Sequence, residues 1–150
     1  MSSLYVRNQL KQFLSTYAPS EKVVDLTAEF SELSDLLETY EISLNDTWTG
    51  VQFIGHDEVP ITVGSNNSHG KYRETGAIYI HVVDIASLGV SDRILARAES
   101  LRDLLRGRKL GTMFLESMTP VNFESGAALR FEDGYMCGSF MLSYQNDKDF

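Results

Sequence analysis

GAIYIHVVDIA, residues 76–86, is the strongest β-strand pattern in the chain. Ile78, Ile80 and Val82 fall on one face of a strand with a two-residue period. The opposite face carries Tyr79, His81, Val83 and Ile85. About nine residues at roughly 3.3 Å each give a strand near 30 Å long. A strand of this length predicts a sheet as the centre of the fold.

The segment that follows, residues 91–106, predicts an amphipathic helix. Ser91 suits an N-cap, Asp92 suits the positive end of the helix dipole, and Gly107 can close the C-terminus. The apolar stripe consists of Ile94, Ala98, Leu101 and Leu105, widened by Leu95 and Leu104. The surface left for solvent carries Arg93, Arg97, Arg102, Glu99 and Asp103.

The other elements place helices and strands in alternating groups. Apolar residues recur at helical spacing over 3–17, and Pro19 lies just beyond. A short edge strand is expected within 22–30, a second helix is weakly indicated over 31–42, and further strands are expected at 48–55, 59–64, 112–119, 127–132 and 135–144. Asp133-Gly134 predicts a hairpin turn. This order favours one α+β domain over 1–150, with a mostly antiparallel sheet and two main helices on one face.

Composition limits the classes of function. The chain has 150 residues, is 43% hydrophobic and carries a net charge of −8. Such a charge argues against binding nucleic acid through a basic footprint. The N-terminal residues do not resemble a signal peptide, and no apolar run reaches the roughly 18 residues of a membrane span. The lone Cys137 excludes an intrachain disulfide, so a cytoplasmic setting is expected.

The stretch TVGSNNSHGKYRETG, residues 62–76, resembles a phosphate-binding loop at first sight. A Walker loop has four residues between its glycines and a hydroxyl residue after the lysine. Five residues separate Gly64 from Gly70, Tyr72 follows Lys71, and a strand rather than a helix comes next. We therefore expect a long polar loop joining two strands, and no nucleotide or other cofactor.

Catalytic and metal chemistry find little support in the pattern. His56, His69 and His81 lack the spacing of a zinc site, so no metal is expected. A nucleophile–base pair of Cys137 and His81 would suit a small hydrolase or ligand-binding domain. Cys137, however, lies inside an expected strand rather than at a strand-to-helix turn. We expect His81 to be a half-buried sheet residue and the protein not to be an enzyme.

The arginines of the 91–106 helix allow two interpretations. Arg93 with Arg97, and Arg102 with Arg106, are like-charged pairs four residues apart, with acidic residues between them. They can form a solvated helix face. Alternatively, they can contact an acidic partner, including another copy of this acidic protein.

Three segments together resemble the tail terminator (tail-completion) proteins of long-tailed bacteriophages, similar in architecture to the lambda tail terminator. They are KYRETGAIYIHVVDIA, DRILARAESLRDLLRGRKLG and FESGAALRFEDGYMCGSFMLSYQND. The order of elements and the total length match over nearly the whole chain. The stretch from Leu26 to Asn45 is longer than the lambda-like pattern needs.

The resemblance implies a structural virion protein at the head–tail junction, made in the host cytoplasm. A homohexameric ring would cap the tail tube, end its polymerisation and meet head connector or stopper proteins. DNA would cross an acidic lumen without specific binding. Expected interface residues are Asn66, Asn67, His69, Lys71, Arg73, Arg93, Arg97 and Arg106. A head-completion or stopper component, or a capsid decoration protein, is the alternative among virion proteins.

Overall fold

The structure is a computed structural model that describes residues 3–27, 38–42, 46–60, 71–85, 87–123 and 135–149. Its helices and strands follow the order helix, strands, helix, strands. They are α1 (Leu4–Tyr17), β1 (Val23–Asp25), β2 (Trp48–Pro60), β3 (Lys71–Ile85), α3 (Val90–Leu105), β4 (Lys109–Leu110), β5 (Met113–Met118) and β6 (Tyr135–Asp149).

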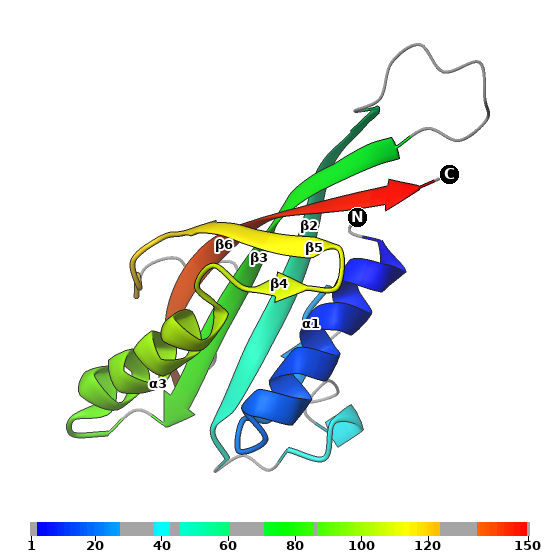
Figure 1. Cartoon of the computed structure of the whole chain (residues 1–150). Helices are drawn as coiled ribbons and strands as arrows, with labels where there is room; N and C mark the ends of the chain where they lie inside the picture. The colour runs from blue at the N-terminus through cyan, green and yellow to red at the C-terminus, as the bar shows by residue number, and fades with distance from the viewer. Residues whose placement is uncertain are drawn as a thin grey trace, which may run out of the picture.

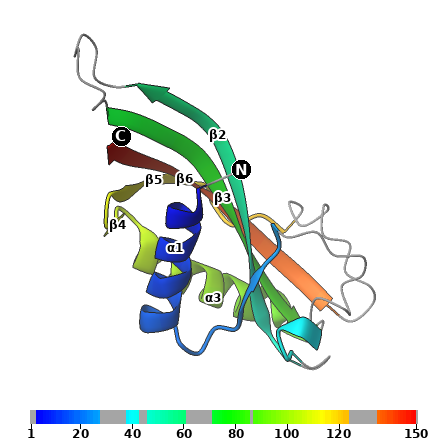
Figure 2. The same ribbon diagram turned by 90° about the vertical axis from the view of Figure 1, so that its right-hand side faces the viewer.

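The strands form one six-stranded sheet in the order β1-β2-β3-β6-β5-β4. β1 runs parallel to β2, whereas the other neighbouring pairs are antiparallel. Helices α1 and α3 lie on the same side of the curved sheet (Figures 1 and 2). The predicted α+β architecture, with a mostly antiparallel sheet and two main helices on one face, is confirmed.

The main core lies between the two helices and the sheet. The predicted stripe of α3 is buried, as are the inward residues Val6, Leu10 and Leu14 of α1. The sheet contributes Ile78, Ile80 and Val82 of β3, with Phe140, Leu142 and Tyr144 of β6. Burying one large aliphatic side chain contributes about 1.5–3 kcal/mol. The two-residue period of the strands and the helical period of α3 therefore point their apolar residues into one layer.

A second, smaller core lies on the other face of the sheet. It contains Val24, Leu26, Ile42, Trp48, Val83 and Cys137. Val83 and Cys137 are opposite each other in the β3–β6 register, so the outer face of these strands is apolar at this end. Leu26, directly after β1, and Ile42 pack onto this face.

The ends of the helices follow the predictions in part. Ser3 caps α1, because its Oγ accepts a hydrogen bond from the Val6 amide at 3.4 Å. The prediction that Ser91 caps α3 is wrong. Helix α3 begins one residue earlier, after Gly89, whose φ of 77° suits a glycine and which gives no side-chain cap. Gly107 follows the helix with a φ of 63°, as its predicted closing role requires.

Strands β2, β3 and β6 are longer than predicted. The 48–55 and 59–64 patterns were expected to be separate strands, yet β2 continues to Pro60 past an irregularity between Gly55 and Asp57. β3 starts at Lys71, so Lys71 and Arg73 belong to a strand rather than to the expected loop. Continuous pairing with β3 and β6 stabilises these polar ends. The two-residue strand β4 was not predicted.

The other sequence predictions concern segments that lie wholly or largely outside the described residues. They are most of the second helix over 31–42, the strand over 127–132, the Asp133-Gly134 turn, and the tip of the polar loop with Asn66, Asn67 and His69.

Candidate functional site

The long strands β2 and β3, with the end of β6, form an arm that projects beyond both helices (Figure 1). Pairing continues between β2 and β3 as far as Pro60 and Tyr72, and between β3 and β6 as far as Lys71. Residues 56–60 of β2 are all exposed. We define the arm as residues 54–60, 71–77 and 143–149. It is the most prominent projection in the described part of the chain.

Two predicted interface residues, Lys71 and Arg73, lie on this arm. Arg73 donates from Nε and Nη2 to the Asp147 carboxylate at 2.7 and 3.0 Å. The hydrogen bonds that Arg73 donates to the Asp147 carboxylate lower the pKa of Asp147 and raise the pKa of Arg73. Both side chains are more than a third exposed, so this pair orients the surface more than it stabilises the fold.

A buried carboxylate fixes the arm to the helical layer. Glu74 accepts a hydrogen bond from the Tyr144 hydroxyl at 2.6 Å and one from the Ser3 amide at 3.3 Å. Ser3 is the N-cap of α1, so a single side chain joins that helix to β3 and β6. Close by, a Cβ on Gly76 would meet the Ile54 carbonyl oxygen and the Tyr144 ring. Glycine at this position lets β2 and Tyr144 approach β3 closely.

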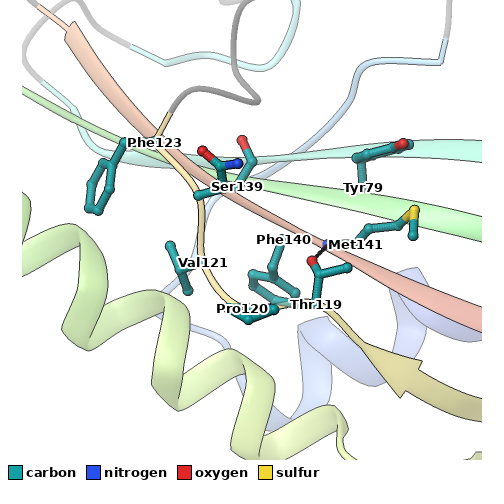
Figure 3. Close-up of a pocket in the computed structure, with 9 residues that line it drawn as sticks. Tyr79, Thr119, Pro120, Val121, Phe123, Ser139, Phe140 and Met141 are labelled. Carbon is teal, nitrogen blue, oxygen red and sulfur yellow. Dashed lines mark hydrogen bonds between the residues drawn. The ribbon is translucent and has the colours of Figure 1, made fainter.

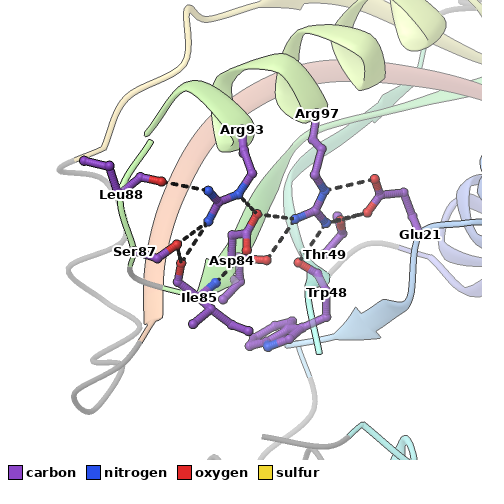
Figure 4. A network of polar contacts seen from close by, with 10 residues as sticks. Glu21, Trp48, Thr49, Asp84, Ile85, Ser87, Leu88, Arg93 and Arg97 are labelled. Atoms are coloured by element: carbon purple, nitrogen blue, oxygen red, sulfur yellow. Dashed lines mark hydrogen bonds and ion pairs between the residues drawn. The ribbon is translucent and has the colours of Figure 1, made fainter. Parts of the chain in front are cut away.

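Arg97, expected on the solvent-facing surface of α3, is instead directed into the fold (Figure 4). Its guanidinium bonds Glu21 at 2.6 and 3.2 Å and the carbonyl oxygen of Val83 at 3.0 Å. The Thr49 hydroxyl also donates to Glu21, at 2.8 Å. Burial acts to raise the pKa of Glu21, but the hydrogen bonds from Arg97 and Thr49 outweigh it, and the pKa is lowered. The prediction of a solvated Arg97 is wrong, because the strand ends supply acceptors beneath it.

Arg93 lies next to Arg97 and holds the chain that enters α3 (Figure 4). It donates to the Leu88 carbonyl oxygen at 3.1 Å and to the Ser87 hydroxyl at 2.7 Å. The buried carboxylate of Asp84 lies 3.5 Å from its Nε. These bonds hold the loop before α3 against the first turn of the helix.

The C-terminal end of α3 carries the most exposed of the predicted arginines. Arg106 pairs only loosely with Asp103, at 3.1 Å, with both side chains more than 60% exposed. Arg108 and Lys109 are also exposed, so the turn after α3 is a basic surface. The structure therefore separates the described predicted interface residues into an arm group, a pair of arginines bonded within the fold (Arg93 and Arg97), and this turn.

His81 and Cys137 are brought close together through Ser139. The β3–β6 register sets His81 opposite Ser139, and His81 Nδ1 lies 2.6 Å from Ser139 Oγ. Ser139 Oγ lies 3.5 Å from Cys137 Sγ. Burial lowers the pKa of His81 to about 4 and raises the pKa of Cys137, the latter opposed by the bond to Ser139. The thiol and the imidazole are therefore both neutral at pH 7.

His81 is only 2% exposed, more deeply buried than the half-buried residue that was predicted. Its Nε2 has no hydrogen-bond partner within the described part of the chain. Ser139 is also fully buried. A reacting substrate would need direct access to one of these atoms, and neither side chain is exposed to solvent.

A pocket of about 620 Å³ lies beside this cluster, where the chain that leaves β5 crosses β6 (Figure 3). Its lining combines Tyr79, Ser139, Phe140 and Met141 with residues 119–123. The Met141 amide donates to the Thr119 hydroxyl at 2.9 Å, which holds the crossing chain against β6. None of these lining residues is Asp, Glu, His, Lys or Arg.

The described residues contain no group of three or more His, Cys, Asp or Glu side chains arranged to hold a metal ion. Among the same residues no helix is long and apolar enough to cross a membrane.

Several important contacts were not predicted. Asp25, buried at the end of β1, binds both Arg7 and Lys11 of α1. Burial opposes its ionisation, but these two cations and the Thr27 amide hold the pKa of Asp25 at about 2. The Glu74–Tyr144 bond was missed as well. Each of these contacts joins residues from different helices or strands, so no local sequence pattern predicted it.

Comparison with known proteins supports the fold alone. No protein-family model matches the sequence, and no curated protein matches it. Among solved structures, one similar chain shares 15% sequence identity at a TM-score of 0.51. The match covers 97% of this chain and 96% of that chain. The whole α+β arrangement therefore recurs in another protein at low sequence identity.

Proposed function

We propose that this protein is a phage tail terminator that acts by assembly and docking rather than by catalysis. In this proposal a homohexameric ring caps the tail tube, ends its polymerisation and meets the head connector or stopper proteins. It would be assembled in the host cytoplasm and be part of the virion at the head–tail junction. The proposal rests on the resemblance of the three sequence segments and on the projecting arm.

The arm is the observation that carries most weight. Its outer residues, 56–60 and 71–73, lie beyond the hydrophobic core, so they gain little from burial within the chain. Glu74 and the Arg73–Asp147 pair nevertheless hold the arm in one shape. A rigid projection with exposed edges is suited to contact a neighbouring subunit or a partner ring.

The charge of the chain is consistent with a DNA conduit. Each subunit carries a net charge of −8. A ring of such subunits repels the phosphate backbone, and DNA could pass through its lumen without being bound.

The test measures ring formation and tail-tube length. Light scattering after size-exclusion chromatography and negative-stain images should show rings near six subunits. When the purified tail-tube protein polymerises with this protein present, tubes should stop growing and carry a ring at one end. A chain without residues 65–69 should keep the fold but cap tubes less well. A strictly monomeric protein that leaves tube length unchanged rules the proposal out.

A stopper or head-completion protein is the nearest alternative. Binding to isolated tails supports the terminator, whereas binding only to DNA-filled heads supports the stopper. Binding across the whole head surface would indicate a decoration protein.

A small hydrolase or ligand-binding domain is the candidate from another class, favoured by the His81–Ser139–Cys137 cluster. A Ser139→Ala or Cys137→Ala variant that lost a measurable activity, while its melting temperature stayed unchanged, would support it. The burial of all three side chains favours an effect on packing instead.

A further inference from the structure

Two segments of this acidic chain contain no acidic residue. All 21 Asp and Glu residues lie outside positions 1–20 and 104–115, whereas five of the 13 basic residues lie within them. The two segments therefore carry +5, and the remainder of the chain carries 8 − 21 = −13. The net charge of −8 is thus the sum of two regions of opposite sign.

The fold brings these two segments together where α1 lies beside β4 (Figures 1 and 2). Near the start of α1, the Tyr5 hydroxyl accepts a hydrogen bond from the Thr112 amide at 3.1 Å. About two turns further along the helix, the Arg108 guanidinium lies 5.9 Å from the centre of the Phe13 ring. We call residues 5, 9, 13 and 17 of α1, together with residues 108–112, the α1–β4 seam.

The α1–β4 seam is partly apolar and open to solvent. The Phe13 ring lies 4.7 Å from the Tyr17 ring, and Tyr17 is 61% exposed. These two residues line a groove of about 340 Å³ with Leu110, and no charged side chain is among the lining residues. Protein interfaces are enriched in aromatic residues at their centre. The groove is therefore suited to receive one apolar side chain of a partner.

Two cations beside the groove have no carboxylate partner. Arg108 uses its Nε to bond the Leu104 carbonyl oxygen at 3.0 Å, and both Arg108 and Lys109 are exposed. Neither forms an ion pair within the described part of the chain. Alternation along β4 places Lys109 on the opposite side of the strand from Arg108, so the two charges flank this edge of the sheet. The other cations of the two segments already pair with carboxylates: Arg7, Lys11 and Arg106.

The charge distribution favours a short acidic peptide segment over nucleic acid as the partner. Carboxylates are attracted to the two uncompensated cations. A nucleic acid would extend beyond the seam onto a surface that carries −13 in total, and its phosphates would be repelled there. A short segment contacts the seam alone and avoids this repulsion.

We propose that the α1–β4 seam docks an acidic segment of another protein. The carboxylates of this segment meet Arg108 and Lys109, and one of its apolar side chains enters the groove beside Phe13 and Tyr17. The inference goes beyond the proposed function, because it names a surface that does not belong to the arm and a partner defined by its charge.

Fluorescence anisotropy with a labelled synthetic peptide tests this surface. The probe is a peptide of about eight residues in which Glu and Asp flank one central tryptophan, a length typical of segments that lie in a groove. A second peptide has Gln and Asn in place of the acidic residues. The acidic peptide should bind at least about tenfold more tightly than the neutral one at about 50 mM salt. This advantage should shrink at about 500 mM, because salt screens the charges.

Variants of the protein locate the binding site. Arg108→Glu, and separately Lys109→Glu, should weaken binding of the acidic peptide by about tenfold or more, because like charges then face each other. Tyr17→Ser should weaken it by about threefold or more, since one wall of the groove is lost. All three residues are exposed, so the melting temperatures by circular dichroism should stay close to that of the wild type.

Lys22→Glu is the matched control, with the same change of −2 in net charge as Arg108→Glu. Lys22 is 49% exposed and precedes β1, which lies at the opposite edge of the sheet from β4. This variant should bind the acidic peptide within about twofold of the wild type, because the change in net charge alone has a small effect.

The inference is overturned if the acidic peptide does not bind at concentrations up to about 1 mM. Equal binding of the neutral peptide overturns it too, as does an equal loss in Lys22→Glu and Arg108→Glu. Single-stranded DNA of about 12 nucleotides is the second probe, and tighter binding of DNA that depends on Arg108 would make the seam a nucleic-acid contact instead. Self-association of the wild type that Arg108→Glu abolishes would assign the seam to a second copy and also overturn the inference.

Tube capping is judged separately from peptide binding. A protein that binds the acidic peptide at the seam but leaves tube length unchanged refutes only the proposed function. A protein that caps tubes but does not bind the peptide refutes only the docking of an acidic segment.

Discussion

Arg97 offers the sharpest test of how the fold is held together, through the variant Arg97→Met. Methionine keeps the length of the side chain but removes the two bonds to Glu21 and the one to the Val83 carbonyl oxygen. Removing one partner of a buried ion pair costs about 3–5 kcal/mol. The side chains of Arg97 and Glu21 are 21% and 14% exposed, so water relieves part of this cost. We expect a loss of about 2–3 kcal/mol at pH 7.

The pH dependence of this loss of stability shows whether the charge of Glu21 causes it. The pKa of Glu21 is lowered in the folded wild type, so the pair stabilises the fold above the usual Glu pKa of 4.5. This contribution disappears as the pH falls through the folded pKa. In Arg97→Met, burial of Glu21 without its cation raises the pKa of the carboxyl instead. The difference between the two proteins should therefore shrink to below about 1 kcal/mol near pH 3.

Urea unfolding at pH 7 and pH 3, followed by circular dichroism, measures both quantities. The melting temperature at pH 7 should fall by about 4–12 °C for a chain of this size. Arg106→Met on the exposed end of α3 is the matched control, measured at the same protein concentration, with an expected loss below about 0.5 kcal/mol. Adding Glu21→Gln to Arg97→Met should recover part of the stability. An equal loss at both pH values would mean that packing, not charge, is responsible, and would refute the reasoning.

Three further predictions concern buried groups. Asp25→Asn should lower the free energy of unfolding by about 2 kcal/mol at pH 7. Because the pKa of Asp25 in the folded protein is about 2, the wild type should lose its higher stability between about pH 4 and pH 2. Urea unfolding at several pH values measures this difference in stability. His81 should titrate near pH 4 by NMR, and its unfavourable protonation should lower the free energy of unfolding of the wild type as the pH falls from 6.5 toward 4. His81→Asn should remove this pH dependence of stability. An NMR titration midpoint of His81 near pH 6.5 would disprove the prediction. Gly76→Ala should cost at least about 2 kcal/mol in thermal unfolding because its Cβ meets the Ile54 carbonyl oxygen, whereas Gly107→Ala, with a positive φ but open space, should cost about 1 kcal/mol.

The fold was predictable where each residue's environment follows from its neighbours in sequence. Alternation over residues 78–83 identified β3 and assigned its two faces, and the stripe from Ile94 to Leu105 identified α3. The ends of β2 and β3 were missed because exposed strand ends carry no apolar alternation. Their pairing is visible only in the register of β2 with β3 and of β3 with β6.

The candidate contact residues were also predictable only in part. Of the basic turn at residues 106–109 only Arg106 was expected at a contact, whereas Lys71 and Arg73 of the arm were both expected at one. Arg97 and Arg106 both lie outside the apolar stripe of α3, yet the side chain of Arg97 is only 21% exposed and bonded to Glu21, whereas that of Arg106 is 61% exposed. The difference depends on which strand ends lie beneath the helix. That arrangement is a property of the packed fold.

Local sequence patterns were sufficient to predict the fold class, the main helices and the long central strand. The hydrophobic period and the signals for helix ends depend on residues within a few positions of one another. The tertiary structure alone decided which charges are buried, which carboxylate joins α1 to the arm, and which edges of the sheet stay open. These outcomes depend on contacts between residues 70 or more positions apart, such as Ser3 with Glu74 and Arg97 with Glu21. Free energies of that kind arise from desolvation and geometry in three dimensions, and a linear pattern does not encode them.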